Sequence, residues 1–172
     1  MTYDTLKHHR RSIRLKGYDY TQPGVYFVTV VTRESECSFG EIVNNEMVVN
    51  PVGKIVLDTW GWLASQYAYV TLDEYCVMPN HFHGVIMIND TGVCRGGSRT
   101  APTKTKSLGR LIGAFKTVST KRINEMRGTP GAMVWQRNYY EHIIRNEREL
   151  GRIRAYIAAN PTRWQEDEEY AE

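Results

Sequence analysis

The sequence of 172 residues predicts one α+β domain, in which helices cover one face of an antiparallel sheet. Three observations lead to this fold class. Segments with strand composition alternate with segments that keep a helical apolar stripe, a split alternation typical of α+β sandwiches. Pairs of turn-forming residues join neighbouring strands, which favours antiparallel pairing. The length fits one domain of roughly 100–200 residues, and the 41% hydrophobic and 24% charged residues exclude collagenous, low-complexity and fully disordered chains.

Seven segments have the composition of strands or extended chain. They are residues 25–32, 39–43, 47–49, 71–78, 81–88, 134–136 and 139–144. Residues 25–32, VYFVTVVT, are β-branched and aromatic throughout, which predicts a strand that is buried on both faces or lies at the centre of a sheet. Asn44-Asn45 and Pro79-Asn80 are turn pairs, so each predicts a hairpin between the strands that flank it.

Three segments keep apolar residues at a 3.6-residue spacing and predict helices. They are residues 50–66, 107–126 and 146–160. Asn50 followed by Pro51 provides a cap and a first-turn proline for the first helix. Glycines at 128 and 131 break the second helix, and Pro161 ends the third.

Charge is distributed unevenly along the chain. The net charge is +3, but residues 1–165 carry +8 and the acidic tail, 166–172, carries −5. We expect one domain over residues 1–165, with a basic arm at 1–24 and a basic loop at 89–107. This positive domain predicts a polyanionic partner, although charge alone does not say which one.

Cysteine usage and the N-terminal segment bear on the compartment. Cys37, Cys76 and Cys94 are odd in number and form no C-x-x-C pair. The first seventeen residues are charged where a secretory leader needs an apolar run. These observations predict a cytoplasmic protein. Every apolar stretch is far shorter than the ~20 residues that a membrane-spanning helix needs, so we expect no membrane partner.

The first candidate site is an H-x-H pair at the start of a predicted strand. Side chains alternate along a strand, so His81 and His83 point to one face while Phe82 points to the other. Two imidazoles directed at one point favour a divalent metal ion, completed by oxygen ligands. His142 or a carboxylate or amide from elsewhere is the possible third ligand, and a hydrogen-bonded or surface pair is the alternative.

The second candidate site lies on the last predicted helix. Arg152, Tyr156 and Asn160 are spaced i, i+4, i+8 and share a stripe beside the apolar one. A tyrosine becomes a nucleophile when a cation or metal stabilises its phenolate. If this helix packs near the histidines, Asn160 becomes a third metal ligand. The alternative for Tyr156 is ordinary half-buried packing, and the other tyrosines considered, Tyr139 and Tyr140, lie in a predicted strand.

Taken together, these motifs resemble a known family. MPNHFHG, followed some seventy residues later by YIAANP, resembles the single-tyrosine HUH transposases, in particular the REP-associated tyrosine transposases. The resemblance covers nearly the whole chain. It includes RRSIRLKGYDYTQPGVYFVTV, LDEYCVMPNHFHGVIMI, LGRLIGAFK and WQRNYYEHIIRNERELGRIRAYIAANP.

The resemblance implies a ferredoxin-like (RRM-like) sheet and a specific chemistry. His81, His83 and Asn160 would bind Mg²⁺ or Mn²⁺, with Asn160 standing where many relatives have Gln. Tyr156 would cleave hairpin-bearing single-stranded DNA and form a 5′-phosphotyrosine, and strand transfer would reverse that step. Relatives of this kind act as monomers or homodimers, and the sequence does not choose between the two states.

Basic residues of the arm, the loop and two helices are candidate contacts to DNA phosphates. They are Arg10, Arg11, Arg14, Lys104, Lys106, Arg110, Lys116, Lys121, Arg122 and Arg152. Two other functions fit part of the pattern. A non-catalytic single-stranded nucleic-acid-binding module would explain the charge, and a metal phosphodiesterase that activates water would use the histidines without Tyr156.

Overall fold

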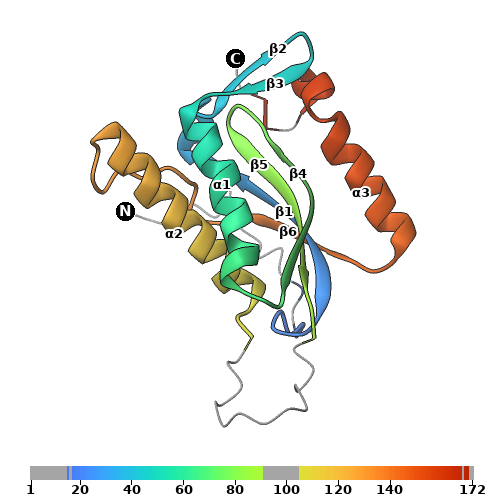
Figure 1. The fold of residues 1–172 in the computed structure, drawn as a ribbon. Coiled ribbons are helices and arrows are strands. Elements are labelled where there is room, and N and C mark those ends of the chain that lie inside the picture. The colour runs from blue at the N-terminus through green and yellow to red at the C-terminus, as the bar shows by residue number, and fades with distance from the viewer. Residues whose placement is uncertain (1–14, 16, 91–104, 168, 171–172) are drawn as a thin grey trace, which may run out of the picture.

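A computed structural model describes residues 15, 17–90, 105–167 and 169–170, drawn in colour in Figure 1. The strands are β1 (Gly24–Val31), β2 (Gly40–Val43), β3 (Glu46–Val49), β4 (Val70–Val77), β5 (His81–Ile88) and β6 (Tyr140–Ile144). The helices are α1 (Pro51–Gln66), α2 (Leu108–Arg127) and α3 (Glu147–Ala159), with short 3₁₀ segments η1 (Arg33–Ser35) and η2 (Pro161–Glu166). No described helix combines the length and the apolar character that crossing a membrane requires.

The central feature is a four-stranded antiparallel sheet with the order β4-β5-β1-β6. Apart from the β2–β3 hairpin and α3, the chain runs β-α-β-β-α-β, which is the ferredoxin-like arrangement. The α+β class and the antiparallel sheet with helices packed on it are confirmed. β1 and β5 are the two central strands and pair over their full length, from Gly24 opposite Ile88 to Val31 opposite His81.

The helices cover the two faces of this sheet differently. Figure 1 shows α1 and α2 on one side and α3 on the other. We predicted helices on one face, which holds for α1 and α2, whereas α3 covers the opposite face. The reason lies in the central strands: Tyr26, Val28 and Val30 enter the α1–α2 core, while Phe27 and Val85 pack with α3. Strands that are apolar at every position need cover on both sides.

Side chains along β5 point alternately to the two faces of the sheet, so that packing residues lie on one face and the two histidines on the other. Phe82 packs against the indole of Trp60, with ring centroids 4.7 Å apart. A Cβ on Gly84 would lie 2.6 Å from a ring carbon of Trp60, so glycine makes room for the indole. His81 and His83 alternate with these residues and therefore face α3.

Local turn and cap chemistry fixes the elements beside the sheet. Asn44 and Asn45 have φ values of 52° and 65°, as a two-residue hairpin turn requires. The Asn50 side chain accepts hydrogen bonds from the backbone N–H groups of Val52 (2.9 Å) and Gly53 (3.0 Å), which caps α1 as predicted. Segment 134–136 forms only an isolated bridge, between Trp135 and Thr32, the residue that follows β1.

Candidate functional site

The two histidines of the H-x-H pair lie together beneath α3. β5 begins at His81, and the side chains of His81 and His83 are 0% and 3% exposed. Their Nε2 atoms are 3.0 Å apart. Two neighbouring ligands of an octahedral cation, each about 2.1 Å from it, lie about 3.0 Å apart. The pair therefore has the spacing that a small divalent cation needs.

The amide of Asn80 determines which nitrogen of His81 carries a proton. Its Nδ2 donates to the backbone carbonyls of Ser35 (3.2 Å) and Glu169 (2.6 Å), so its Oδ1 is the atom that faces His81. An amide oxygen only accepts, so His81 donates from Nδ1 over 2.8 Å. In a neutral imidazole, Nε2 then presents a lone pair toward His83.

The hydroxyl of Thr29 plays the corresponding part for His83. It lies 2.9 Å from Nδ1 of His83 and can donate or accept. When it donates, Nε2 of His83 carries the proton and bonds to His81. When it accepts, both Nε2 lone pairs face one point, and a cation there would stabilise them. The pair is thus compatible with a hydrogen-bonded state and with a metal-loaded state.

Burial keeps both imidazoles uncharged. It lowers the pKa of His81 to about 3. Burial, and then the neighbouring His81, lower the pKa of His83 to about 3, against the opposing effect of the Asp167 carboxylate. Neutral imidazole is the form that binds metal ions, so at neutral pH no proton has to leave before binding.

Tyr156 reaches this pair from α3. Its hydroxyl lies 3.5 Å from Nε2 of His83, at the long limit of a hydrogen bond. Its ring packs edge-on against Phe27 and lies 5.3 Å from the His83 ring. The side chain is still 45% exposed, so it borders both the buried histidines and solvent. The hydroxyl of Tyr156 therefore lies beside one of the two histidines, His83, within one chain.

Polar contacts fix α3 in the position that brings Tyr156 to His83. The guanidinium of Arg154 donates two hydrogen bonds to Asp73 on β4, over 2.7 and 2.6 Å. At the start of α3, the Asn146 side chain accepts from the Glu149 N–H, and Glu149 in turn accepts from His142 over 2.7 Å. Bidentate contacts hold geometry closely, so α3 cannot turn without breaking them.

Asn160 follows Tyr156 by one helical turn, at the end of α3. The residue is 3% exposed, and its Oδ1 is one of the buried oxygens that lack a hydrogen-bond partner in the described part of the chain. A buried amide oxygen without a partner is costly unless a cation or water completes it. His142, the alternative third histidine, is instead held by Glu149. The two imidazoles and the buried Asn160 oxygen are donor atoms of a kind that a divalent cation accepts.

Asp167 lies beside the two histidines, and the sequence analysis did not place it there. Its side chain is 4% exposed, and its Oδ2 lies 3.9 Å from Nε2 of His81. One atom each of His81, His83 and Asp167 lie within 4.8 Å of one another. We counted Asp167 only as part of an acidic tail, and no local spacing links it to the histidines.

Among the residues that the structure describes, most of the predicted DNA contacts lie away from the histidines. Arg10, Arg11, Arg14 and Lys104 are outside the described residues. Arg110, Lys116, Lys121 and Arg122 belong to α2, on the opposite face of the sheet. Lys106 precedes α2 and contacts Tyr67, with its ammonium 4.8 Å above the ring. Arg152 alone of the described candidates shares α3 with Tyr156.

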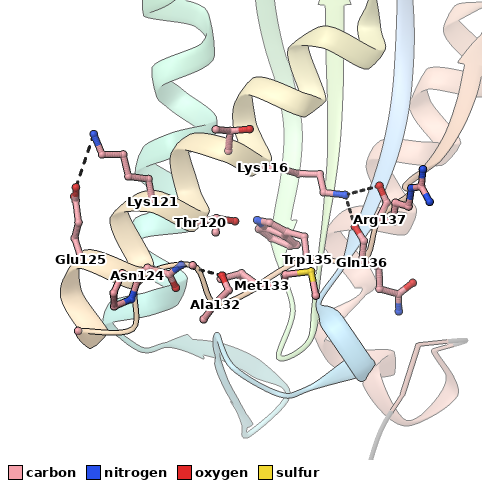
Figure 2. Close-up of a pocket in the computed structure, with 15 residues that line it drawn as sticks. Lys116, Thr120, Lys121, Asn124, Glu125, Ala132, Met133, Trp135, Gln136 and Arg137 are labelled. Carbon is pink, nitrogen blue, oxygen red and sulfur yellow. Dashed lines mark hydrogen bonds and ion pairs between the residues drawn. The ribbon is translucent and has the colours of Figure 1, made fainter.

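The side chain of Lys116 is bound to backbone carbonyl groups of its own chain. Its ammonium donates to the backbone carbonyls of Gln136, Arg137 and Asn138, at one side of a pocket between α2 and residues 128–137 (Figure 2). Burial lowers the pKa of Lys116 to about 8. A phosphate contact from Lys116 would have to replace one of these carbonyls. Lys121 lies 3.8 Å from Glu125 at the same pocket.

Comparison with known proteins places this geometry in a family. No family model matches the chain. An uncharacterized protein of Haemophilus influenzae is 37% identical over 178 residues, covering 99% of this chain and 98% of that protein. A candidate REP-associated tyrosine transposase of the same organism is 24% identical over 147 residues, covering 84% and 74%. The chain belongs to the family of the first protein.

A solved structure also resembles this chain and, like the second of these proteins, is described as a REP-associated tyrosine transposase. It is a REP-associated tyrosine transposase bound to a REP hairpin, with a TM-score of 0.57 and 15% identity over 88% of this chain and 74% of that one. The chain has the REP-associated tyrosine transposase fold. The resemblance stated from the sequence is therefore confirmed. In this transposase fold, the structure groups His81, His83 and Tyr156 at one place, between the sheet and α3.

Proposed function

We propose that this chain is a transposase-type enzyme that cleaves and rejoins hairpin-bearing single-stranded DNA, with Tyr156 as the nucleophile. The proposal depends above all on one observation, the 3.5 Å between the Tyr156 hydroxyl and Nε2 of His83. A phenol is a poor nucleophile by itself, so a tyrosine beside two inward-facing imidazoles needs a cation to become reactive. The transposase fold adds to the support.

The residues that would hold the cation are His81, His83 and Asn160. When bound, Mg²⁺ or Mn²⁺ would supply positive charge against the scissile phosphate. Asn80 and Thr29 orient the imidazoles, so the Nε2 atoms are positioned before any ion arrives. Arg154 and Asp73 fix the helix that carries Tyr156.

The proposed reaction is a transesterification. The Tyr156 oxygen forms a bond to phosphorus, and the bond from phosphorus to the 3′ oxygen breaks. The phenolic proton is transferred overall to that leaving oxygen, which becomes a free 3′-hydroxyl, and the 5′ side stays attached as phosphotyrosine. Attack by another 3′-hydroxyl reverses these steps and joins two strands. One phosphodiester replaces another, so no nucleoside triphosphate is required.

The proposed partner is single-stranded DNA that contains a hairpin. The solved relative is bound to a REP hairpin, and residues 1–165 of this chain carry a net charge of +8. Arg152 is the proposed phosphate contact beside Tyr156, and the arm, the loop and α2 provide the other proposed contacts. Because the hydroxyl of Tyr156 meets His83 of the same chain, a monomer would contain a complete site.

A covalent adduct assay tests the proposal. Wild-type protein with Mn²⁺ and a panel of labelled hairpin strands is expected to form an adduct that survives denaturing electrophoresis. Tyr156→Phe should abolish the adduct. Tyr140→Phe is the matched control, because Tyr140 is equally exposed and also borders Phe27, and it should retain the adduct.

The same assay separates the other two functions. Cleavage that persists in Tyr156→Phe would favour a hydrolase that uses water. Hairpin binding without any cleavage, by protein that is folded and supplied with Mg²⁺ or Mn²⁺, would favour a binding module. Either result would contradict the proposed role of Tyr156.

A further inference from the structure

The carboxylate of Asp167 occupies an unusual environment. It is almost fully buried, and it is 3.9 Å from Nε2 of His81, beyond hydrogen-bond distance. Among the described residues, no lysine or arginine lies within ion-pair distance of it. A buried carboxylate without a cation is unfavourable, because burial removes its hydration without replacing it.

The two oxygens of Asp167 have different surroundings. Oδ1 accepts a hydrogen bond from the backbone N–H of Glu169 over 2.8 Å. Oδ2 faces His81, whose Nε2 presents a lone pair because its Nδ1 donates to Asn80. Two atoms that can only accept thus face each other.

A cation between these two atoms would compensate both of them. Ligands about 2.1 Å from an octahedral cation are separated by about 3.0 Å when neighbouring and about 4.2 Å when opposite. The 3.0 Å between the two imidazoles matches neighbouring ligands. The 3.9 Å from Oδ2 to His81 is shorter than the separation of opposite ligands, so one cation can reach both atoms, and the three ligand atoms together lie within 4.8 Å of one another.

Several contacts keep Asp167 in place. The Trp164 ring lies 5.9 Å from the His81 ring and 5.2 Å from that of Tyr170. Asn80 donates to the Glu169 carbonyl over 2.6 Å, so the residue that orients His81 also holds the segment that carries Asp167. The η2 turn, 161–166, connects Asn160 directly to this carboxylate.

We propose that Asp167 is a ligand of the divalent cation, together with His81, His83 and Asn160. This inference depends on the metal site of the proposed function and extends it. Two imidazoles and an amide carry no charge, so they give a divalent ion no electrostatic compensation. A carboxylate supplies one negative charge and the hard oxygen that Mg²⁺ and Mn²⁺ prefer.

Direct Mn²⁺ binding tests the proposal without DNA and without activity. Free Mn²⁺ gives a six-line electron paramagnetic resonance spectrum that weakens on binding, so a titration of the full chain yields Kd. Asp167→Asn keeps the shape and removes the charge, and it should weaken binding by at least ~10-fold. Asp167→Glu keeps a carboxylate and should bind more tightly than Asp167→Asn.

The matched control is Glu166→Gln. It makes the same change in net charge one residue away, at an exposed carboxylate that pairs with Arg163, and it should leave Kd unchanged. Thermal unfolding of the metal-free variants checks that each is folded. Because Asp167 has no cationic partner in the described chain, we expect Asp167→Asn to be at least as stable as wild type without metal.

The outcomes separate this inference from the proposed function. If His81→Ala loses Mn²⁺ while Asp167→Asn binds like wild type, Asp167 is not a ligand and the rest of the metal site stands. If Asp167→Asn and Glu166→Gln weaken binding equally, the effect is general charge, which also overturns the inference. If His81→Ala binds Mn²⁺ as tightly as wild type, the proposed metal site itself fails.

Discussion

The two faces of the sheet differ in what they bury. The α1–α2 face buries large apolar side chains, including Trp60, Phe82 and Phe115, which contact one another. The α3 face has a smaller apolar cluster and also encloses His81 and His83. One face thus provides most of the apolar burial that stabilises the fold, and the other positions polar groups at some cost. Substitutions on the α1–α2 face should therefore lower stability, and substitutions on the α3 face should abolish activity while the protein stays folded.

The largest expected effect on stability lies in the α1–α2 core. Trp60 is fully buried, so Trp60→Ala should lower the free energy of unfolding by about 3–5 kcal/mol. Tyr156→Phe removes one hydroxyl from a half-exposed side chain on the other face. This substitution should change the free energy of unfolding by less than about 1 kcal/mol. Urea denaturation of both variants measures the difference. Equal losses would contradict the division between the faces.

Gly84 offers a second test of the same core. A Cβ there would press on the Trp60 indole, so Gly84→Ala should destabilise the protein by about 1–3 kcal/mol. The control is Gly61→Ala on α1, where a Cβ would meet nothing within 4 Å. That change should be neutral or stabilising, because alanine favours a helix. Thermal melts of the two variants measure the difference. A Gly84→Ala variant as stable as wild type would argue against close packing of β5 on the Trp60 indole.

A smaller effect is expected at the pair that holds α3. Hydrogen bonds from Arg154 lower the pKa of the Asp73 carboxyl below its usual 3.8. A group with a lowered folded-state pKa stabilises the protein above its unfolded pKa and loses that effect as pH falls through the folded one. The stability difference between wild type and Asp73→Asn should therefore be present at pH 6 and vanish at acidic pH below 3.8. A difference that is constant with pH would show that the ion pair does not stabilise α3.

The smallest effect concerns DNA affinity. Arg152→Ala should weaken hairpin binding a few-fold and reduce the slope of log K against log salt by about 0.7–0.9, as loss of one phosphate contact requires. Arg127→Ala at the end of α2 removes the same charge far from Tyr156 and serves as the control. Fluorescence anisotropy at 50 and 200 mM salt measures both. An identical slope for wild type and Arg152→Ala would remove Arg152 from the interface.

Local pattern predicted most of the elements but not how they pack together. Alternation alone placed His81 and His83 on one face of β5, and the cap at Asn50 located the start of α1. The spacing of Tyr156 and Asn160 identified a stripe of α3. The choice of face for α3 depends on apolar residues in β1 and β5, which are far apart in the chain, so helical periodicity could not supply it.

Long-range contacts also explain what was missed. Asp167 is brought to His81 by η2 and by the hydrogen bond from Asn80 to Glu169, and neither leaves a local pattern in the sequence. The acidic composition of 166–172 instead indicated only an acidic tail outside the domain. Lys116 was predicted to contact phosphate because it lies in a basic stretch, whereas its ammonium meets three backbone carbonyls of a segment twenty residues away.

The central claim is that Tyr156 becomes covalently attached to DNA, and peptide mapping of the adduct tests it most directly. Trypsin should release Tyr156 in residues 155–163, AYIAANPTR, which contain no other tyrosine, and Tyr139 and Tyr140 in residues 138–145. After nuclease trimming, mass spectrometry should find a nucleotide attached through phosphate to the 155–163 peptide. A nucleotide on 138–145, or an adduct on neither peptide, would contradict the assignment of Tyr156 as the nucleophile.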